Sequence, residues 1–324
     1  MKLLVCGGAG YVGSHAVRKL VQTGHNVTVL DNLSTGHRAA VRTVDFVEAD
    51  VRDSVALDAV FASHRFDAVM HFCALSVVGE SVRDPAAYYD NNVQGSLNLF
   101  RAMLRAGVDK LVFSSTAAVY GDPQDDRIAE AHPCRPINPY GASKHMVERM
   151  LSDLAAAHGL RSVSLRYFNA AGASPGGDIG ESHAPETHLI PNVLRAALGT
   201  GPRLKVFGRD YPTPDGTCVR DFVHVDDLAD AHERALDHLN RREGAAVFNL
   251  GNGAGFSVIE VIEACRRVTD LLIEFDQEAR RAGDPAVLVA CSALARAELG
   301  WTPRYTQLDE IVETAWRWHK AAAY

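Results

Sequence analysis

Tyr140 and Lys144 lie four residues apart in the segment NPYGASK, residues 138–144. Asn138 is a good helix N-cap and Pro139 suits the first helical position, so both side chains should share one face of the first helical turns. A free phenol has a pKa near about 10, too high for a base at neutral pH, but a nearby ammonium favours the phenolate and lowers that pKa. The pair could therefore serve as a general base, although a Tyr and a Lys at this spacing also occur together by chance.

A glycine-rich segment, GGAGYVG at 7–13, directly follows the first expected strand and opens the first expected helix. Gly7, Gly10 and Gly13 suit a tight turn, close approach of the backbone to a pyrophosphate, and close helix–strand contact. Asp31 ends the next strand, 18 residues after Gly13, where a carboxylate can accept hydrogen bonds from the adenosine ribose and would repel a 2′-phosphate. The segment therefore predicts a dinucleotide site that prefers NAD to NADP.

The elements that must position these residues alternate regularly in the first half of the chain. Runs rich in Val and Leu without strict alternation predict strands that are buried on both faces, and the longer segments between them predict helices. The expected strands are 2–6, 26–30, 44–48, 66–71, 110–114 and 162–166, and the expected helices are 11–23, 53–62, 85–106 and 138–158. This order predicts an α/β fold with a doubly wound parallel sheet, the NAD-binding Rossmann fold.

The pattern changes after about residue 170. Residues 171–187 are rich in Gly, Ser and Pro and predict a loop. Shorter elements follow: helices near 189–198, 225–239, from about 257 and at 306–322, and strands at 204–207, 218–223 and 246–250. We expect an NAD-binding domain over 1–170 and a smaller α/β substrate-binding lobe over 171–324, with some elements of the second part returning to the first.

Composition argues against several other classes of protein. The chain has 324 residues, of which 47% are apolar and 23% charged, and its net charge of −7 comes without a basic stripe of the kind that binds nucleic acid. No apolar run is long enough to cross a bilayer, and the first strand begins directly after Met1, so we expect no membrane segment and no signal peptide. The six cysteines and fourteen histidines show no metal-ligand spacing such as CxxC or HExxH, so we expect free thiols, a cytoplasmic location and no metal site.

The motifs together resemble the extended short-chain dehydrogenase/reductases. Two residues between the first two glycines are typical of that family, as are Asp50-Val51 after the third strand and the Tyr–Lys pair. Within the family, the chain is most similar to the UDP-sugar 4-epimerases, over nearly its whole length. The strings that carry this resemblance are HFCAL (71–75), VGESV (78–82), YYDNNV (88–93), FSSTAAVYG (113–121), RYFN (166–169), DGT (215–217) and RDFVHV (220–225).

The resemblance implies a role for each matching residue. Tyr140 would be the general base, Lys144 would bind the nicotinamide ribose and lower the pKa of the tyrosine, and Thr116 would hydrogen-bond the 4-hydroxyl of the sugar. The implied cofactor contacts are Gly7, Gly10, Tyr11, Val12, Gly13, Asp31, Asn32, Asp50, Val51, Phe72, Ala74, Asn92, Ser114, Tyr140, Lys144 and Tyr167. The implied substrate contacts are Thr116, Tyr140, Asn169, Leu189, Phe207, Arg220, Arg281 and Asp284. Permanently charged arginines suit a diphosphate, and an apolar ring such as Phe207 suits a uracil.

The implied reaction inverts C4 of UDP-glucose or UDP-galactose through a 4-keto sugar, with NAD as hydride acceptor and donor. Two positions depart from the family pattern. Ser76 stands where relatives often have a basic residue that contacts a cofactor phosphate. Leu288 stands where a bulky aromatic residue restricts relatives to glucose and galactose and a small residue admits N-acetylated sugars. UDP-N-acetylhexosamines and UDP-pentoses therefore remain alternative substrates.

Other functions within the fold are disfavoured by the residues after Thr116. Sugar-nucleotide 4,6-dehydratases have Asp-Glu there, and UDP-glucuronate decarboxylases have a Glu two residues on, whereas this chain has Ala117 and Ala118, which cannot move protons. A non-catalytic NAD sensor typically loses the tyrosine, which is present here. Relatives are commonly homodimers, and helices 85–106 and 138–158 are the expected interface.

Overall fold

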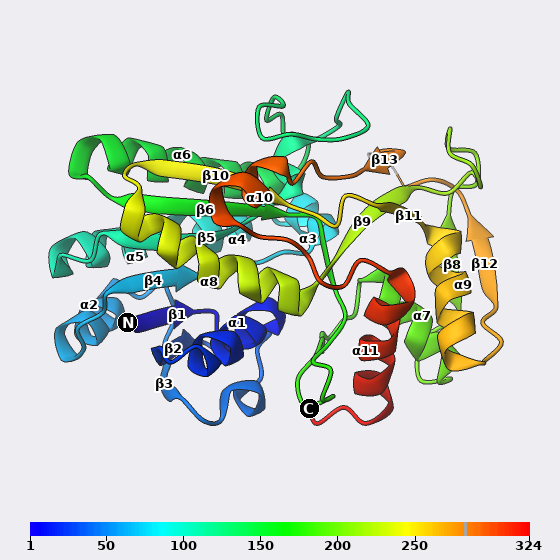
Figure 1. Ribbon diagram of the computed structural model, residues 1–324, viewed down its shortest axis with the longest axis horizontal. Coiled ribbons are helices and arrows are strands. Elements are labelled where there is room, and N and C mark those ends of the chain that lie inside the picture. Colours follow the sequence, from blue (N-terminus) through cyan, green and yellow to red (C-terminus); the bar gives the residue numbers. More distant parts are fainter. Residues whose placement is uncertain (282–283) are drawn as a thin grey trace.

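A seven-stranded parallel sheet forms the larger part of the fold in the computed structural model, which describes residues 1–281 and 284–324 (Figure 1). The strand order is β10-β6-β5-β4-β1-β2-β3, the doubly wound Rossmann order extended by one strand. The strands are β1 (Lys2–Cys6), β2 (Asn26–Asp31), β3 (Asp45–Glu48), β4 (Ala68–His71), β5 (Lys110–Thr116), β6 (Arg161–Tyr167) and β10 (Ala245–Leu250). The predicted fold class is confirmed.

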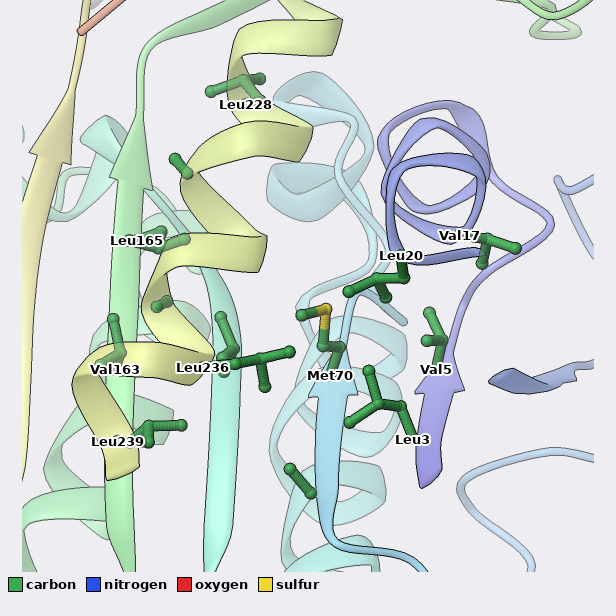
Figure 2. Close-up of a cluster of buried hydrophobic side chains, with 14 of the residues drawn as sticks. Leu3, Val5, Val17, Leu20, Met70, Val163, Leu165, Leu228, Leu236 and Leu239 are labelled. Atoms are coloured by element: carbon green, nitrogen blue, oxygen red, sulfur yellow. The ribbon is translucent and has the colours of Figure 1, made fainter. Parts of the chain in front are cut away.

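Helices cover both faces of this sheet, which explains why the central strand β1 buries apolar side chains on both faces. In β1, Leu3 and Val5 belong to one hydrophobic cluster, while Leu4 and Cys6 belong to the cluster on the opposite face. Helices α1 (Tyr11–Gln22) and α8 (Val225–Arg241) pack on the first face, as Figure 2 shows for their leucines and valine. Helices α2 (Ser54–Ser63), α5 (Gly95–Ala106) and α6 (Pro139–His158) pack on the second. Each fully buried aliphatic side chain contributes about 1.5–3 kcal/mol to this packing.

The remaining elements form a smaller lobe with its own core. Strand β9 (Val219–His224) pairs with β7 (Asn169–Ala171), β11 (Gly255–Ser257) and β13 (Val287–Leu288), and β8 (Leu204–Phe207) pairs with β12 (Phe275–Glu278). Helices α7 (Leu189–Ala197), α9 (Val258–Thr269) and α11 (Leu308–Lys320) contribute most of the lobe's buried side chains. In Figure 1 this lobe lies to the right of the large sheet.

The lobes are not strictly consecutive in sequence. Helix α8 and strand β10 lie beyond residue 170 but belong to the large sheet and its cover, and α10 (Ala293–Leu299) contributes Ala295 and Leu299 to the same core. The division into an NAD-binding part over 1–170 and a substrate-binding part over 171–324 therefore stays a prediction about function.

The expected single helix over 85–106 differs from the structure. Helix α4 (Pro85–Tyr88) continues through a π-helical stretch (Tyr89–Gln94) into α5, all with right-handed helical dihedrals at the junctions. Such π turns frequently occur at functional sites, and this one contains Asn92. Short elements were not expected from the sequence: α3 (Val78–Arg83), α10, the 3₁₀ turns Arg38–Val41 and Ala117–Tyr120, and strands β7, β11, β12 and β13.

None of the helices within the described residues is both long and apolar enough to span a bilayer.

Candidate active site

The start of α6 is fixed against the end of β5. Asn138 caps the helix by accepting a hydrogen bond from the N–H of Gly141 at 2.9 Å, and Pro139 occupies the first helical position. A Cβ atom at Gly141 would lie 2.4 Å from the carbonyl oxygen of Ala118, in the turn that follows Thr116. Only glycine permits this approach, and the approach brings the first turn of α6 to the carboxyl end of β5.

Half-buried Tyr140 and buried Thr116 meet at this point. Burial raises the pKa of the Tyr140 phenol, and the hydrogen bond with Thr116 opposes that rise. The structure therefore corrects the expectation that Lys144 lowers this pKa in the chain by itself. The pKa is shifted upward, because the effect of burial on the phenol exceeds that of Thr116.

Lys144 makes its hydrogen bond elsewhere. Its ammonium donates to the backbone carbonyl of Ser114 at 2.7 Å and lies 4.8 Å from the centre of the Phe113 ring. Burial lowers the pKa of this ammonium to about 8. Within the part of the chain that the structure describes, no hydrogen bond joins Lys144 to Tyr140. Lys144 is thus held beside β5, close to where the sheet ends.

A buried ionic network that no sequence motif predicts fastens α6 to strands β5 and β6. Glu148 lies one turn beyond Lys144 and accepts two hydrogen bonds from Arg166 of β6, at 2.9 and 2.5 Å. It also accepts one from Ser115 of β5 at 2.5 Å, and Arg166 donates to the Tyr120 hydroxyl at 2.9 Å. Burial is the largest single influence on the pKa of Glu148 and would raise it. The hydrogen bonds from Arg166, His145 and Ser115 and the charge of Arg166 together outweigh burial and lower the pKa to about 2.

The glycine loop leaves space where a dinucleotide would need it. A Cβ at Gly7, whose φ is +78°, would lie 2.6 Å from the backbone nitrogen of Cys73, and one at Gly13 would lie 2.2 Å from the carbonyl oxygen of Gly7. Packing within the protein therefore requires both glycines. A Cβ at Gly10 would instead meet nothing closer than 3.5 Å, although Gly10 is the N-cap of α1. Because the helix N-terminus favours anions, the open space at Gly10 fits the pyrophosphate of NAD.

Polar residues at the ends of β2 and β3 continue this site. Asp31 accepts hydrogen bonds from the N–H groups of Ala9 at 2.9 Å and Leu33 at 2.8 Å, and burial raises its pKa. Asn32 donates to Asp50 at 2.8 Å. Hydrogen bonds from Arg52 lower the pKa of Asp50 far below its usual range. Both carboxylates are held by local hydrogen bonds at the edge where the ribose of a dinucleotide is expected.

The segment after β4 is fastened to α6 through Asn92. Its amide accepts from the N–H of Leu75 at 2.8 Å and donates to the Leu75 carbonyl and the Ser143 hydroxyl, both at 3.0 Å. Residues 72–75 follow β4, so this clasp holds Phe72 and Ala74 beside the glycine loop. At the neighbouring strand ends, the hydroxyls of Ser114 and Tyr167 lie 2.5 Å apart. Val51 is buried in the hydrophobic cluster on the sheet face that α2, α5 and α6 cover.

Tyr11 links the glycine loop to the smaller lobe. Its hydroxyl donates to the carbonyl oxygen of Gly172 at 2.6 Å, just after β7. Its neighbour Val12 packs against the core beneath α1. The first turn of α1 is therefore tied to a segment far away in sequence.

The predicted substrate residues lie in the smaller lobe. Arg220 of β9 forms an ion pair with Asp284, and the guanidinium of Arg281 lies 3.9 Å from the centre of the Phe207 ring. Asn169 begins β7 and Leu189 begins α7. Among the described residues, none of these side chains forms a hydrogen bond with Tyr140.

The two positions that depart from the family pattern lie in different surroundings. Leu288 of β13 pairs in register with Arg220 and packs against the cluster of Ala117, Val119 and Tyr120 that follows Thr116. Ser76 is exposed. Leu288 therefore lies between the predicted diphosphate arginine and the predicted catalytic threonine.

The register of the large sheet explains how distant residues meet. Thr116 pairs with Tyr167, and Cys6 pairs with both Leu30 and His71, so the ends of β5, β6, β1, β2 and β4 form one edge. Ligands of doubly wound sheets bind outside this carboxyl edge. The predicted catalytic and cofactor residues converge there.

Comparison with known proteins agrees with this geometry. Residues 3–251 match the model of the NAD dependent epimerase/dehydratase family. The chain belongs to this family. It is similar to a UDP-glucose 4-epimerase of Halalkalibacterium halodurans, with 53% identity over 99% of this chain and 96% of that protein.

Solved structures of epimerases in this family resemble the chain along its length. A Brucella ovis UDP-glucose 4-epimerase in complex with NAD is 48% identical and superposes with a TM-score of 0.95, covering 97% of both chains. A Bifidobacterium longum UDP-glucose 4-epimerase in complex with NAD+ and UDP is 38% identical, with a TM-score of 0.94 and coverage of 99% of this chain and 98% of that one.

Proposed function

We propose that this chain is an NAD-dependent isomerase that interconverts UDP-glucose and UDP-galactose by inverting C4 of the sugar. The observation that carries the proposal is that Tyr140 meets Thr116 at the carboxyl edge of the sheet and that Ala117 and Ala118 follow the threonine. A base without a neighbouring acid can remove and return one proton, but it cannot drive elimination from the sugar. The 53% identical relative, a UDP-glucose 4-epimerase, supports the same activity.

The chain's own residues move the proton. The Tyr140 phenolate removes the 4-hydroxyl proton, and the Thr116 hydroxyl orients that oxygen. NAD, when bound, supplies the acceptor and donor of hydride. Once the proton has left the 4-oxygen and the hydride has left C4, the sugar would be a 4-keto form that turns over in the pocket. Return of hydride to the other face of C4 would invert that carbon, and Tyr140 would return the proton to the 4-oxygen. Because burial raises the pKa of Tyr140, the base needs additional positive charge to ionise near neutral pH.

The residues around the glycine loop would hold the NAD. We assign Gly10 and the first N–H groups of α1 to the pyrophosphate, and Asp31 and Asn32 to the adenosine ribose. Lys144 would bind the nicotinamide ribose, which its position on the Ser114 carbonyl permits. The other contacts we propose are Gly7, Tyr11, Val12, Gly13, Asp50, Val51, Phe72, Ala74, Asn92, Ser114, Tyr140 and Tyr167.

The smaller lobe would hold the UDP group. Arg220 and Arg281 provide two permanent positive charges for the diphosphate, and Phe207 provides an apolar ring for the uracil. Asp284 is the present partner of Arg220, so substrate would compete for that guanidinium. Asn169 and Leu189 begin neighbouring elements and complete the proposed set.

The size of the sugar pocket depends on Leu288. This side chain packs beside the turn after Thr116, so its volume limits the groups that a sugar can carry there. Leucine is smaller than the aromatic residues that exclude N-acetyl groups. UDP-N-acetylhexosamines are therefore the second candidate substrates.

We further propose a cytoplasmic homodimer that pairs through α5 and α6. Helix α6 has an exposed Met146, 45% accessible, which a partner subunit would cover. All six cysteines are free, as expected in a reducing compartment. Size-exclusion chromatography with light scattering tests the dimer, and a monomer at micromolar concentration would contradict it.

Product analysis tests the activity. The purified chain is incubated without added cofactor with UDP-galactose, UDP-N-acetylgalactosamine or UDP-arabinose, and the sugars are identified by chromatography. We expect UDP-glucose from UDP-galactose. Conversion of none of the three would contradict the proposed function.

A further inference from the structure

Two histidines and two glutamates converge in the loop that leads into α7. Glu181, His183, Glu186 and His188 each offer one ligand atom, and these four atoms all lie within 4.8 Å of one another. No HExxH or CxxC spacing marks this cluster, so the expectation that the chain has no metal site rested on other spacings. The pattern here is E-x-H-x-x-E-x-H, and the loop's folding brings its four side chains to one point.

The two carboxylate oxygens nearest to Nδ1 of His183 lie at distances close to those between the ligands of a tetrahedral site. Nδ1 of His183 lies 3.2 Å from Oε1 of Glu181 and 3.7 Å from Oε2 of Glu186, and Nδ1 of His188 lies 3.9 Å from Oε1 of Glu186. His188 also contacts Glu181 directly. Ligands at the usual zinc distances of about 2.0–2.2 Å lie about 3.4 Å apart in a tetrahedron. Both imidazoles direct the same nitrogen to the same pair of carboxylates.

Both carboxylates of this cluster are buried. The side chains of Glu181 and Glu186 are 2% and 3% exposed. Within residues 1–281 and 284–324, no lysine or arginine forms an ion pair with either one. Two buried carboxylates beside imidazoles are a donor set that a divalent ion neutralises.

Surrounding groups hold the ligands in place. The indole N–H of Trp318 donates to the carbonyl of Glu181 at 2.8 Å. Oε1 of Glu186 accepts from the N–H groups of Thr187 at 2.8 Å and His188 at 2.9 Å, which leaves Oε2 directed to His183. Supporting hydrogen bonds of this kind orient the ligands of metal sites.

We propose that Glu181, His183, Glu186 and His188 bind one divalent transition-metal ion of the Zn²⁺ class. Two nitrogen and two oxygen ligands favour Zn²⁺ over Mg²⁺, which prefers six oxygen ligands. Four protein ligands complete a tetrahedral shell, so the ion has a structural role and takes no part in the reaction. It would fasten the loop between α1, whose Tyr11 contacts the His183 ring, and α11, which carries Trp318.

Metal counting on the full chain tests this site independently of the enzyme activity. The protein is stripped with a chelator, incubated with Zn²⁺ or Mg²⁺, desalted, and analysed by mass spectrometry of the elements. We expect one Zn²⁺ retained per chain and no Mg²⁺. A chain that retains no Zn²⁺ would overturn the proposal.

Variants locate the ion. We expect His183→Gln to weaken Zn²⁺ binding by more than the roughly 10–100-fold that loss of a supporting group costs. His319→Gln is the matched control, because His319 lies near both carboxylates but outside the ligand set, and it should retain Zn²⁺. Equal retention by both variants would overturn the assignment.

Thermal unfolding of the unmutated chain keeps the test independent of how the variants fold. Zn²⁺ at a hundredfold excess over its Kd should raise the Tm by about 4 °C for a chain of this length, and Mg²⁺ should leave it unchanged. An unchanged Tm with Zn²⁺ would contradict the proposed role of the ion in fastening the loop.

Discussion

Replacing Glu148 by Gln tests whether the buried ion pair with Arg166 holds α6, the helix that carries Tyr140. The substitution keeps the shape of the side chain but removes the charge that pairs with Arg166, whose guanidinium is equally buried. Breaking a buried ion pair by removing one partner costs about 3–5 kcal/mol, because the other charge remains uncompensated. With an unfolding entropy of about 2.1 cal/mol/K per residue, this cost lowers the Tm by about 4–7 °C.

The same helix offers a matched control. Arg149 and Asp153 form an exposed ion pair one turn apart, with side chains 76% and 62% accessible. Because solvent screens such pairs, Asp153→Asn should change stability by less than about 1 kcal/mol. Differential scanning calorimetry of the two variants beside the unmutated chain gives the comparison. Equal changes in Tm for Glu148→Gln and Asp153→Asn would refute the reasoning.

The pH dependence of the difference supplies a second check. The pKa of Glu148 in the folded chain, about 2, lies below its ordinary value of 4.5, so the folded state favours the ionised form. The stability contributed by this carboxylate is therefore complete above pH 4.5 and is lost as the pH falls through 2. Denaturant titrations at several pH values should show the gap between the unmutated chain and Glu148→Gln narrowing over that range. A gap that widens on acidification would contradict the pKa direction.

Three further predictions concern the proposed site. Tyr140→Phe should lower turnover by about 10²–10⁴-fold while bound NAD is retained, measured by product formation and by cofactor release on denaturation; near-normal turnover would remove Tyr140 as the base. Gly13→Ala should destabilise the chain strongly, measured by thermal unfolding, because its Cβ would lie 2.2 Å from the Gly7 carbonyl oxygen. Gly10→Ala should fold but lose bound NAD, measured by the NAD content of the purified protein. A normal NAD content in Gly10→Ala would contradict the pyrophosphate assignment. Leu288→Ala should raise kcat/KM for UDP-N-acetylgalactosamine relative to UDP-galactose, and Leu288→Phe should lower it; an unchanged ratio in both variants would show that Leu288 does not limit the pocket.

Local signals in the sequence were sufficient to predict the strands of the large sheet and the start of α6. The glycine loop, the Asn138-Pro139 cap and the runs of Val and Leu each determine structure through neighbouring residues, so the expected strand and helix bounds differ from the observed ones by only a few residues. The short strands β12 and β13 were missed because pairing with β8 and β9, distant in sequence, defines them.

Contacts between residues on different elements of the fold could not be predicted from the sequence either. Glu148 and Arg166 are 18 residues apart on different elements, and nothing local marks them as a buried pair. The pKa of Tyr140 depends on how deeply the phenol is buried, which the spacing to Lys144 does not reveal. The loop cluster of Glu181 and His188 likewise forms only after the chain folds back on itself.

The hydrogen bond from Tyr11 to the Gly172 carbonyl has a consequence for how the proposed enzyme relates to cellular metabolism. It joins the helix start that would bind the pyrophosphate to the smaller lobe, so dissociation of the proposed dinucleotide would require this bond to break. Exchange with free NAD and NADH should then be slow compared with turnover. Each molecule would reuse its own hydride carrier, and the balance between the two sugars would not depend on the NADH/NAD⁺ ratio of the cell.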